Sequence, residues 1–154
     1  MSDYRAVSDL DLEPILTFRF NMSIDGIGTF ELMEVSGLGY EIGVTEHEVV
    51  VDSTASLRKI SAHLDYDEIE FTRPLSDDMT LYNWIKAIAD GEGHSSVTKN
   101  GTITMFDISG SPVAEWKFES AWPISYSVSD LDISDGSVVT ETMKITHEYL
   151  ERTT

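Results

Sequence analysis

The chain has 154 residues, of which 41% are hydrophobic and 25% charged, so it is sized and composed for one globular domain with an ordinary core. It contains no cysteine, which excludes disulfides, thiol nucleophiles and cysteine-based zinc sites. With 28 acidic and 10 basic residues the formal net charge is -18, which disfavours sequence-specific or general nucleic-acid binding because contacts to phosphates need clustered lysine and arginine.

The N-terminal part of the sequence predicts an arm followed by a hairpin. Residues 1–15 are acidic, show no sustained period and end next to Pro14, which indicates an extended arm before a single domain over residues 16–154. From Leu16 apolar and polar residues alternate, and this predicts a half-buried strand. Asp25-Gly26 is a two-residue turn signal, after which residues 27–35 return as a second strand. The apolar face of the first strand carries Phe18, Phe20, Met22 and Ile24.

The next segment predicts less regular strands. A strand over residues 40–51 loses its alternation at Val49-Val50-Val51, and residues 52–56 indicate a loop. Residues 60–64 form a weak strand pattern. A clearer strand over residues 68–73 is stopped by a proline.

One helix is predicted from capping and periodicity. Ser76 is the expected N-cap, and Gly91 closes the C-terminus. The apolar side chains between them have the spacing of one helix face, so the helix is expected to pack on a sheet. These side chains are Leu81, Trp84, Ile85 and Ile88.

The C-terminal half again predicts strands. A hairpin is expected over residues 101–108 and 112–119, then a short strand over 124–128 and a long one over 138–150. About eight strands and one helix predict a mainly β fold, either a β-barrel or a two-sheet sandwich with one flanking helix.

No catalytic or metal-binding motif is found in the sequence. The histidines, at positions 47, 63, 94 and 147, are far apart, and His147 is expected to be a hydrogen-bonded packing residue. Part of the segment 130–141 matches a calcium-loop template, but Gly136 comes one place late and a strand follows, so the template fails. Its matching residues are Asp130, Asp132, Ser134 and Glu141. We therefore expect neither an enzyme nor a cofactor, and the remaining alternative is a small monomeric β-barrel that binds a ligand or calcium.

The net charge and the first residues of the chain indicate where the protein is made and to which medium its surface is suited. No segment approaches the roughly 18 consecutive apolar residues of a membrane span, and the first residues lack a secretory signal pattern, so synthesis in a cytoplasm is expected. Five lysines against 28 acids suggest a halophilic surface, and the same charge would repel polyanions. Ordinary solvated surface charge is the simpler alternative.

Several segments, in order, resemble the tail-tube family of T4-like phages, which includes the inner tubes of contractile injection systems and is related in fold to the Hcp protein of type VI secretion. The resemblance covers about residues 16–150, and it departs from the family pattern between Glu46 and Ser56, where a segment rich in tyrosine, arginine and glycine is common. The segments that carry it are Phe18-Arg19-Phe20, Ile24-Asp25-Gly26, Glu34 to Leu38, Leu57 to Ile60, Ile69 to Leu75, Leu81 to Ile85, Gly101 to Thr104, Val113 to Phe118, Ala121-Trp122-Pro123, Asp130-Leu131 and Glu141 to Glu148.

This resemblance implies an Hcp-like subunit that forms homohexameric rings stacked into a hollow tube, a conduit for DNA or protein cargo. The implied partners are other copies of the chain and sheath, baseplate and tail-terminator proteins, in a virion tail or an injection particle. Residues 43–59 are expected to contact an adjacent subunit, with a local β-bulge at the three valines as the alternative. The interface candidates are Val49, Val50, Val51, Asp52, Arg58 and Lys59.

Overall fold

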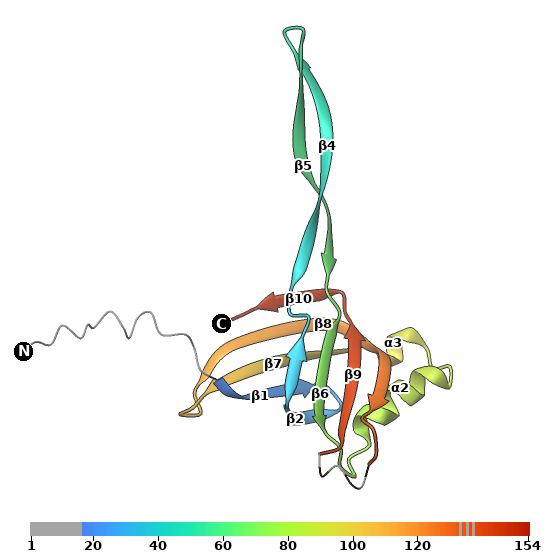
Figure 1. Ribbon diagram of the computed structural model, residues 1–154. Coiled ribbons are helices and arrows are strands. Elements are labelled where there is room, and N and C mark those ends of the chain that lie inside the picture. Colours follow the sequence, from blue (N-terminus) through green and yellow to red (C-terminus); the bar gives the residue numbers. More distant parts are fainter. Residues whose placement is uncertain (1–16, 133, 135, 137) are drawn as a thin grey trace, which may run out of the picture.

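A computed structural model describes residues 17–154 apart from 133, 135 and 137, and shows two β-layers from which one long hairpin projects (Figure 1). The predicted arm, residues 1–15, lies outside the described residues. The described part contains ten strands and two helices: β1 Thr17–Ile24, β2 Gly28–Leu32, β3 Glu34–Ser36, β4 Tyr40–Val51, β5 Thr54–Tyr66, β6 Ile69–Pro74, α2 Thr80–Ala89, α3 His94–Val97, β7 Lys99–Asp107, β8 Pro112–Val128, β9 Thr140–Thr146 and β10 Tyr149–Arg152.

Eight of the strands form one antiparallel sheet, in which seven follow the order β2-β1-β7-β8-β9-β6-β3 and β10 pairs with β8 off this path. Strand β8 belongs to both layers, because its first half pairs with β7 and β10 and its second half with β9. The path has two ends, at β2 and β3, so the predicted mainly β fold is confirmed as a sandwich and not as a closed barrel.

The core lies between the layers and is made of alternating residues. Met22 and Ile24 of β1 face Phe118 of β8 and Ile145 of β9, and all four are almost fully buried. The alternation predicted for the first and last strands is therefore confirmed, although the side chain of Phe18 is outside the described part.

In the second half one predicted interruption is wrong, and one interruption that exists was not predicted. The expected break between residues 119 and 124 is absent, because β8 bends at Ser120, which has a φ of 55° and donates its backbone N–H to Asn100 Oδ1 at 3.0 Å. A bulge lets the strand turn from one layer into the other without ending. Opposite this bend the predicted strand 138–150 divides into β9 and β10.

The helix and the first hairpin also differ in detail from what the sequence predicts. Helix α2 begins at Thr80, not after Ser76, because the Asp78 carboxylate accepts the Thr80 N–H at 3.0 Å. Its apolar face packs on β8 as predicted, and Gly91, with a φ of 90°, ends it. The short helix α3 lies in the predicted loop 91–100, and the predicted strand 27–35 is divided into β2 and β3.

Candidate subunit interface on the projecting hairpin

The hairpin β4–β5 stands away from the two-layered body as a two-stranded sheet of its own (Figure 1). None of its residues, 40–51 and 54–66, is buried. A two-stranded ribbon with water on both faces is marginally stable alone. An exposed element of this length is therefore suited to be completed by contact with another molecule.

The predicted loop over residues 52–56 is wrong, because the turn at the tip contains only Asp52 and Ser53. Their φ angles are 52° and 66°, and both strands continue directly from the turn. Two consecutive residues with positive φ form a turn whose twist matches that of the flanking strands. The sequence does not indicate this turn because glycine and asparagine, the usual residues of such turns, are absent.

The interruption of alternation at Val49-Val50-Val51 is not a bulge. Pairing is regular from Val44 to Val51, and the bulge of this hairpin lies in β5, where Ala62 and His63 lie opposite the single residue Gly43. The valines can follow one another because neither face of the ribbon is buried, so nothing imposes an alternation of apolar and polar residues. The predicted β-bulge at these valines is therefore wrong, and the apolar surface remains to be explained.

The predicted interface residues divide between the two faces and the tip. Because directly paired residues share a face, Val50 lies with Ala55, and Lys59 lies opposite Glu46 on the same face. Arg58 lies opposite His47 on the other face. Asp52 occupies the turn, and Val49 and Val51 share the face of Arg58.

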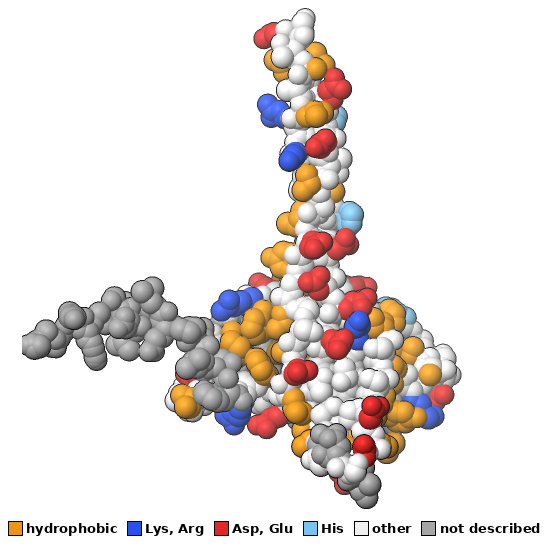
Figure 2. All heavy atoms as spheres, in the orientation of Figure 1, with side chains coloured by type: hydrophobic (Ala, Val, Ile, Leu, Met, Phe, Trp, Pro, Cys, Tyr) orange, Lys and Arg blue, Asp and Glu red, His pale blue; other side chains and the backbone are white. Residues whose placement is uncertain are grey.

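Sequence reasoning missed an apolar stripe on the face of Val50, which Glu46, Glu48 and Lys59 interrupt midway. Six of its side chains are 44–67% exposed, and Figure 2 shows hydrophobic and charged side chains mixed along the hairpin. The two members in β5, Leu57 and Leu64, break strict alternation because the bulge opposite Gly43 adds one residue to β5. The stripe consists of Tyr40, Ile42, Val44, Val50, Leu57 and Leu64.

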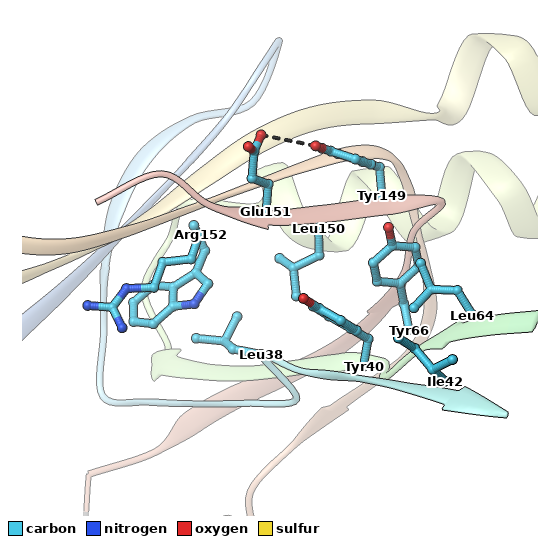
Figure 3. Close-up of a pocket in the computed structure, with 10 residues that line it drawn as sticks. Leu38, Tyr40, Ile42, Leu64, Tyr66, Tyr149, Leu150, Glu151 and Arg152 are labelled. Carbon is cyan, nitrogen blue, oxygen red and sulfur yellow. Dashed lines mark hydrogen bonds between the residues drawn. The ribbon is translucent and has the colours of Figure 1, made fainter. Parts of the chain in front are cut away.

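At the root of the hairpin the stripe enters a groove of about 690 Å³ between β4, β5 and β10 (Figure 3). Tyr66 is the centre of its aromatic wall, with ring centroids 5.8 Å from Tyr40 and 6.4 Å from Tyr149. Arg152 lies over the Trp116 ring at 5.7 Å. The hydrogen bond of the Tyr149 hydroxyl to Glu151, 3.0 Å long, raises the pKa of that tyrosine.

His147 fastens the root of the hairpin to the body. Its Nε2 lies 3.0 Å from the backbone oxygen of Asp67, and its ring centroid is 5.4 Å from that of Tyr66. Burial lowers its pKa, although hydrogen bonds to backbone oxygens oppose the shift. The prediction of a hydrogen-bonded packing histidine is confirmed.

The opposite end of β6 is held by a buried ion pair. The guanidinium of Arg73 donates to Glu141, and the Tyr126 hydroxyl donates to the other carboxylate oxygen at 2.5 Å. Burial, together with this hydrogen bond, raises the pKa of Tyr126 to about 12. Glu141 is thus engaged within the protein, and it does not join Asp130 and Asp132 as a calcium ligand. In the described residues no three acidic or histidine side chains group as a metal site.

The histidines are held apart as the sequence suggested. His63 pairs with Asp65 on the exposed hairpin, and His94 packs edge-on against Trp122 on the body. Among the described helices none is long and apolar enough to cross a membrane. The exposed hairpin and the groove at its root therefore provide surface for association with another molecule.

Comparison with solved structures identifies the fold. The chain is similar to a chain of the anti-feeding prophage baseplate in a six-fold symmetrised cryo-EM structure, with 18% identity, a TM-score of 0.70 and 91% and 95% of the two chains covered. It is similar to a chain of the PVC sheath-tube complex, an extracellular contractile injection system, with 19% identity, a TM-score of 0.73 and 96% and 97% covered. It is also similar to Hcp1 of Flavobacterium johnsoniae, with 16% identity, a TM-score of 0.60 and 88% and 95% of the two chains covered. No curated protein is similar enough in sequence to count as a relative.

The family follows from the sequence match. The model of the T4-like virus tail tube protein gp19 family matches residues 16–151, which spans both layers, the hairpin and the helices. The similar chains in the solved structures share the two-layered fold. The projecting hairpin of this chain offers unburied surface for association. The chain therefore belongs to the T4-like virus tail tube protein gp19 family and is a structural subunit of a tail tube.

Proposed function

We propose that six copies of this chain form a ring, and that the rings stack into the hollow inner tube of a contractile phage tail or injection particle. The observation that carries this proposal is the family match over residues 16–151. The six-fold symmetry of the baseplate structure that contains a similar chain supports the ring size. The role is purely structural, and the channel conducts DNA or a protein cargo.

The hairpin is the main contact between subunits in this proposal. Its residues 43–59 carry apolar side chains that water covers in the single subunit, and Val50 is 65% exposed. Burying such side chains against a neighbour contributes roughly 25 cal/mol per Å² of apolar surface. The interface residues that we propose are Val49, Val50, Val51, Asp52, Arg58 and Lys59.

Sheath, baseplate and terminator proteins are the partners proposed for the finished tube. A sheath would surround it, as in the similar PVC sheath-tube complex. We further propose that the chain is made in the cytoplasm and leaves it within an assembled particle.

Negative-stain electron microscopy of the purified chain at high protein concentration tests the ring. Six-fold rings or striated tubes are expected, and their dimensions would be compared with those of the similar tubes. Particles that stay monomeric in every salt and crowding condition would refute the proposal.

Val50→Asp tests the contribution of the hairpin. A carboxylate at this position should leave the subunit folded, because the side chain touches no core residue, but tubes should be lost. Ile108→Asp is the matched control, since Ile108 is 79% exposed on the distant β7–β8 turn and should not matter for hairpin contacts. Equal tube yields for both variants would remove the hairpin from the interface.

The alternative of a monomeric ligand-binding barrel is not supported. The space between the layers is filled by side chains of β1, β6, β8 and β9, and the strand path is open. Glu141, the last residue of the calcium template, binds Arg73 instead.

A further inference from the structure

The hairpin β4–β5 meets the body at one small joint, where its first strand begins and its second strand ends (Figure 1). The joint is closed by a hydrogen bond of 3.0 Å from the backbone N–H of Asp67 to the backbone oxygen of Gly39. Beyond this bond no residue of either strand, 40–51 or 54–66, is buried. The direction in which the hairpin projects is therefore set by contacts at its root.

His147, in the connection between β9 and β10, contacts this joint from the side of the body. Its side chain is almost fully buried, and its Nε2 lies 3.0 Å from the backbone oxygen of Asp67. Because a carbonyl oxygen only accepts, Nε2 carries the hydrogen and donates it. The ring centroid lies 5.4 Å from that of Tyr66 in the hairpin and 6.5 Å from that of Phe118 in the core. His147 thus links the core to the hairpin.

The second ring nitrogen of His147 makes this link sensitive to charge. Among the described residues, Nδ1 is enclosed and has no hydrogen-bond partner. In the neutral ring Nδ1 holds only a lone pair, whereas proton uptake would place a buried N–H and a positive charge there. An unpaired buried charge costs far more free energy than an unpaired lone pair. Burial accordingly lowers the pKa of His147, although the backbone oxygens of Asp67 and Tyr149 oppose the shift.

The titratable groups around His147 do not replace the missing partner. In the described part of the chain, none of their side chains hydrogen-bonds to the imidazole. Two of the carboxylates, those of Glu119 and Glu151, lie near the hydroxyl of Tyr149 instead. The surrounding titratable residues are Tyr66 and Asp67 at the end of β5, Glu119 of β8, Glu148 in the connection, and Tyr149 and Glu151 of β10.

A protonated imidazole therefore has to move toward water. This movement would break the hydrogen bond to Asp67 and separate the ring from Tyr66, which also packs on Tyr40 and Tyr149 in the groove (Figure 3). The body does not depend on these contacts, because its core is filled by side chains of β1, β6, β8 and β9. Segments with few buried contacts open at a lower free energy than the core. We therefore expect opening to be confined to the hairpin root.

We propose that His147 is a pH-dependent latch, which holds the hairpin in a fixed direction while the imidazole is neutral and releases the root when the imidazole takes up a proton. The latch acts within one subunit and does not depend on the proposed tube function. Within a tube, release would loosen whatever contacts the hairpin makes.

Hydrogen exchange followed by mass spectrometry tests the latch in the natural chain. The protein is kept at a concentration at which light scattering shows single subunits, and protection factors are compared between pH 8 and about pH 5. Protection of the root, residues 37–42 and 64–69, should fall about tenfold for each unit by which the pKa of His147 differs between the latched and released states. Protection of β1 in the body should stay constant.

His147→Gln is the main comparison, because a glutamine amide can donate to the Asp67 oxygen but does not titrate in this range. Its root should be protected equally at both pH values. His63→Gln is the matched control, since it removes a histidine of the hairpin that is 74% exposed, and it should behave as the natural chain does. Because nearby carboxylates titrate in all three proteins, the difference between them is the informative quantity.

Three results would overturn the latch. They are root protection in the natural chain that is independent of pH, an equal fall in His147→Gln, and loss of protection in β1 at the same pH as in the root. If His147→Gln does not fold, NMR of the natural chain decides, because the ring signals of His147 and the opening of the root must then change at the same pH. All these measurements use single subunits, so a failure to form tubes would leave them unaffected.

Discussion

Arg73 of β6 and Glu141 of β9 lie directly opposite each other in the strand pairing, and their side chains form an ion pair that is only 6% and 3% exposed. A second ion pair joins the same two strands but is exposed: Lys144 Nζ lies 3.8 Å from Glu70 Oε2. The side chains of Glu70 and Lys144 are 48% and 39% exposed. The same chemistry is thus present twice in one strand pair, once buried and once in water.

Glu141→Gln should lower the free energy of unfolding by about 3 kcal/mol, the lower end of the range for a broken buried ion pair. Arg73 would lose its buried counter-charge and keep only the half-exposed carboxylate of Asp78, 3.4 Å away. Glu70→Gln, the matched control, should cost less than about 1 kcal/mol because water screens that pair. Urea denaturation followed by circular dichroism measures both. Similar losses for the two variants would mean that burial does not set the value of the ion pair.

His147 should make stability depend on pH. Its pKa is lowered in the folded protein, so the unfolded chain binds the proton more readily. The stability that comes from keeping this histidine neutral is fully present above the unfolded pKa of about 6.5. It is lost as the pH falls through the folded pKa. Urea denaturation at pH values from 8 down to about 5 should show a decline that is shallower in His147→Gln.

His63→Gln is the control for this pH dependence, since its ring is 74% exposed. Because carboxylates titrate in all three proteins, only the difference between curves is informative. If the natural chain and His147→Gln give parallel curves, the buried histidine has no such role.

Gly37 follows β3 and is required for a steric reason. An added Cβ would lie 1.9 Å from the backbone oxygen of Glu68, whereas at Gly28 nothing lies within 4 Å. Both glycines have positive φ, so Gly28→Ala measures the backbone strain alone, roughly 1 to 3 kcal/mol. Gly37→Ala should cost clearly more or prevent folding. Thermal melts compare them, and equal melting temperatures would contradict the predicted clash.

Tube assembly should be favoured by salt. In the proposed rings, six subunits at -18 each bring like charges close together, and their repulsion is screened over about 3 Å at 1 M salt instead of about 8 Å under physiological conditions. Light scattering across a salt series should therefore show more assembly at high salt. Assembly that is independent of salt would indicate that the charges are paired or far apart at the interfaces.

If the surface is halophilic, the single subunit should also lose stability on dilution of salt. Circular dichroism of Val50→Asp, the variant expected not to assemble, isolates this effect from the proposed ring formation. An unchanged melting temperature from low to molar salt would reject the halophilic interpretation.

The sequence alone was sufficient where one face of an element is buried. In β1, Met22 and Ile24 alternate with polar residues because one side of the strand meets the core, and the same holds for Met143 and Ile145 in β9. Capping by Gly91 was also predictable, since few residues adopt its φ.

Only the tertiary structure decided the course of the hairpin. Both faces of β4 and β5 meet water, so no alternation marks their length, and the turn at Asp52-Ser53 uses residues that carry a weak turn signal. The bend of β8 at Ser120 depends on where β9 and β10 attach. The pairing of Arg73 with Glu141 joins residues 68 positions apart, and such a contact is fixed by strand register, which local sequence patterns do not contain.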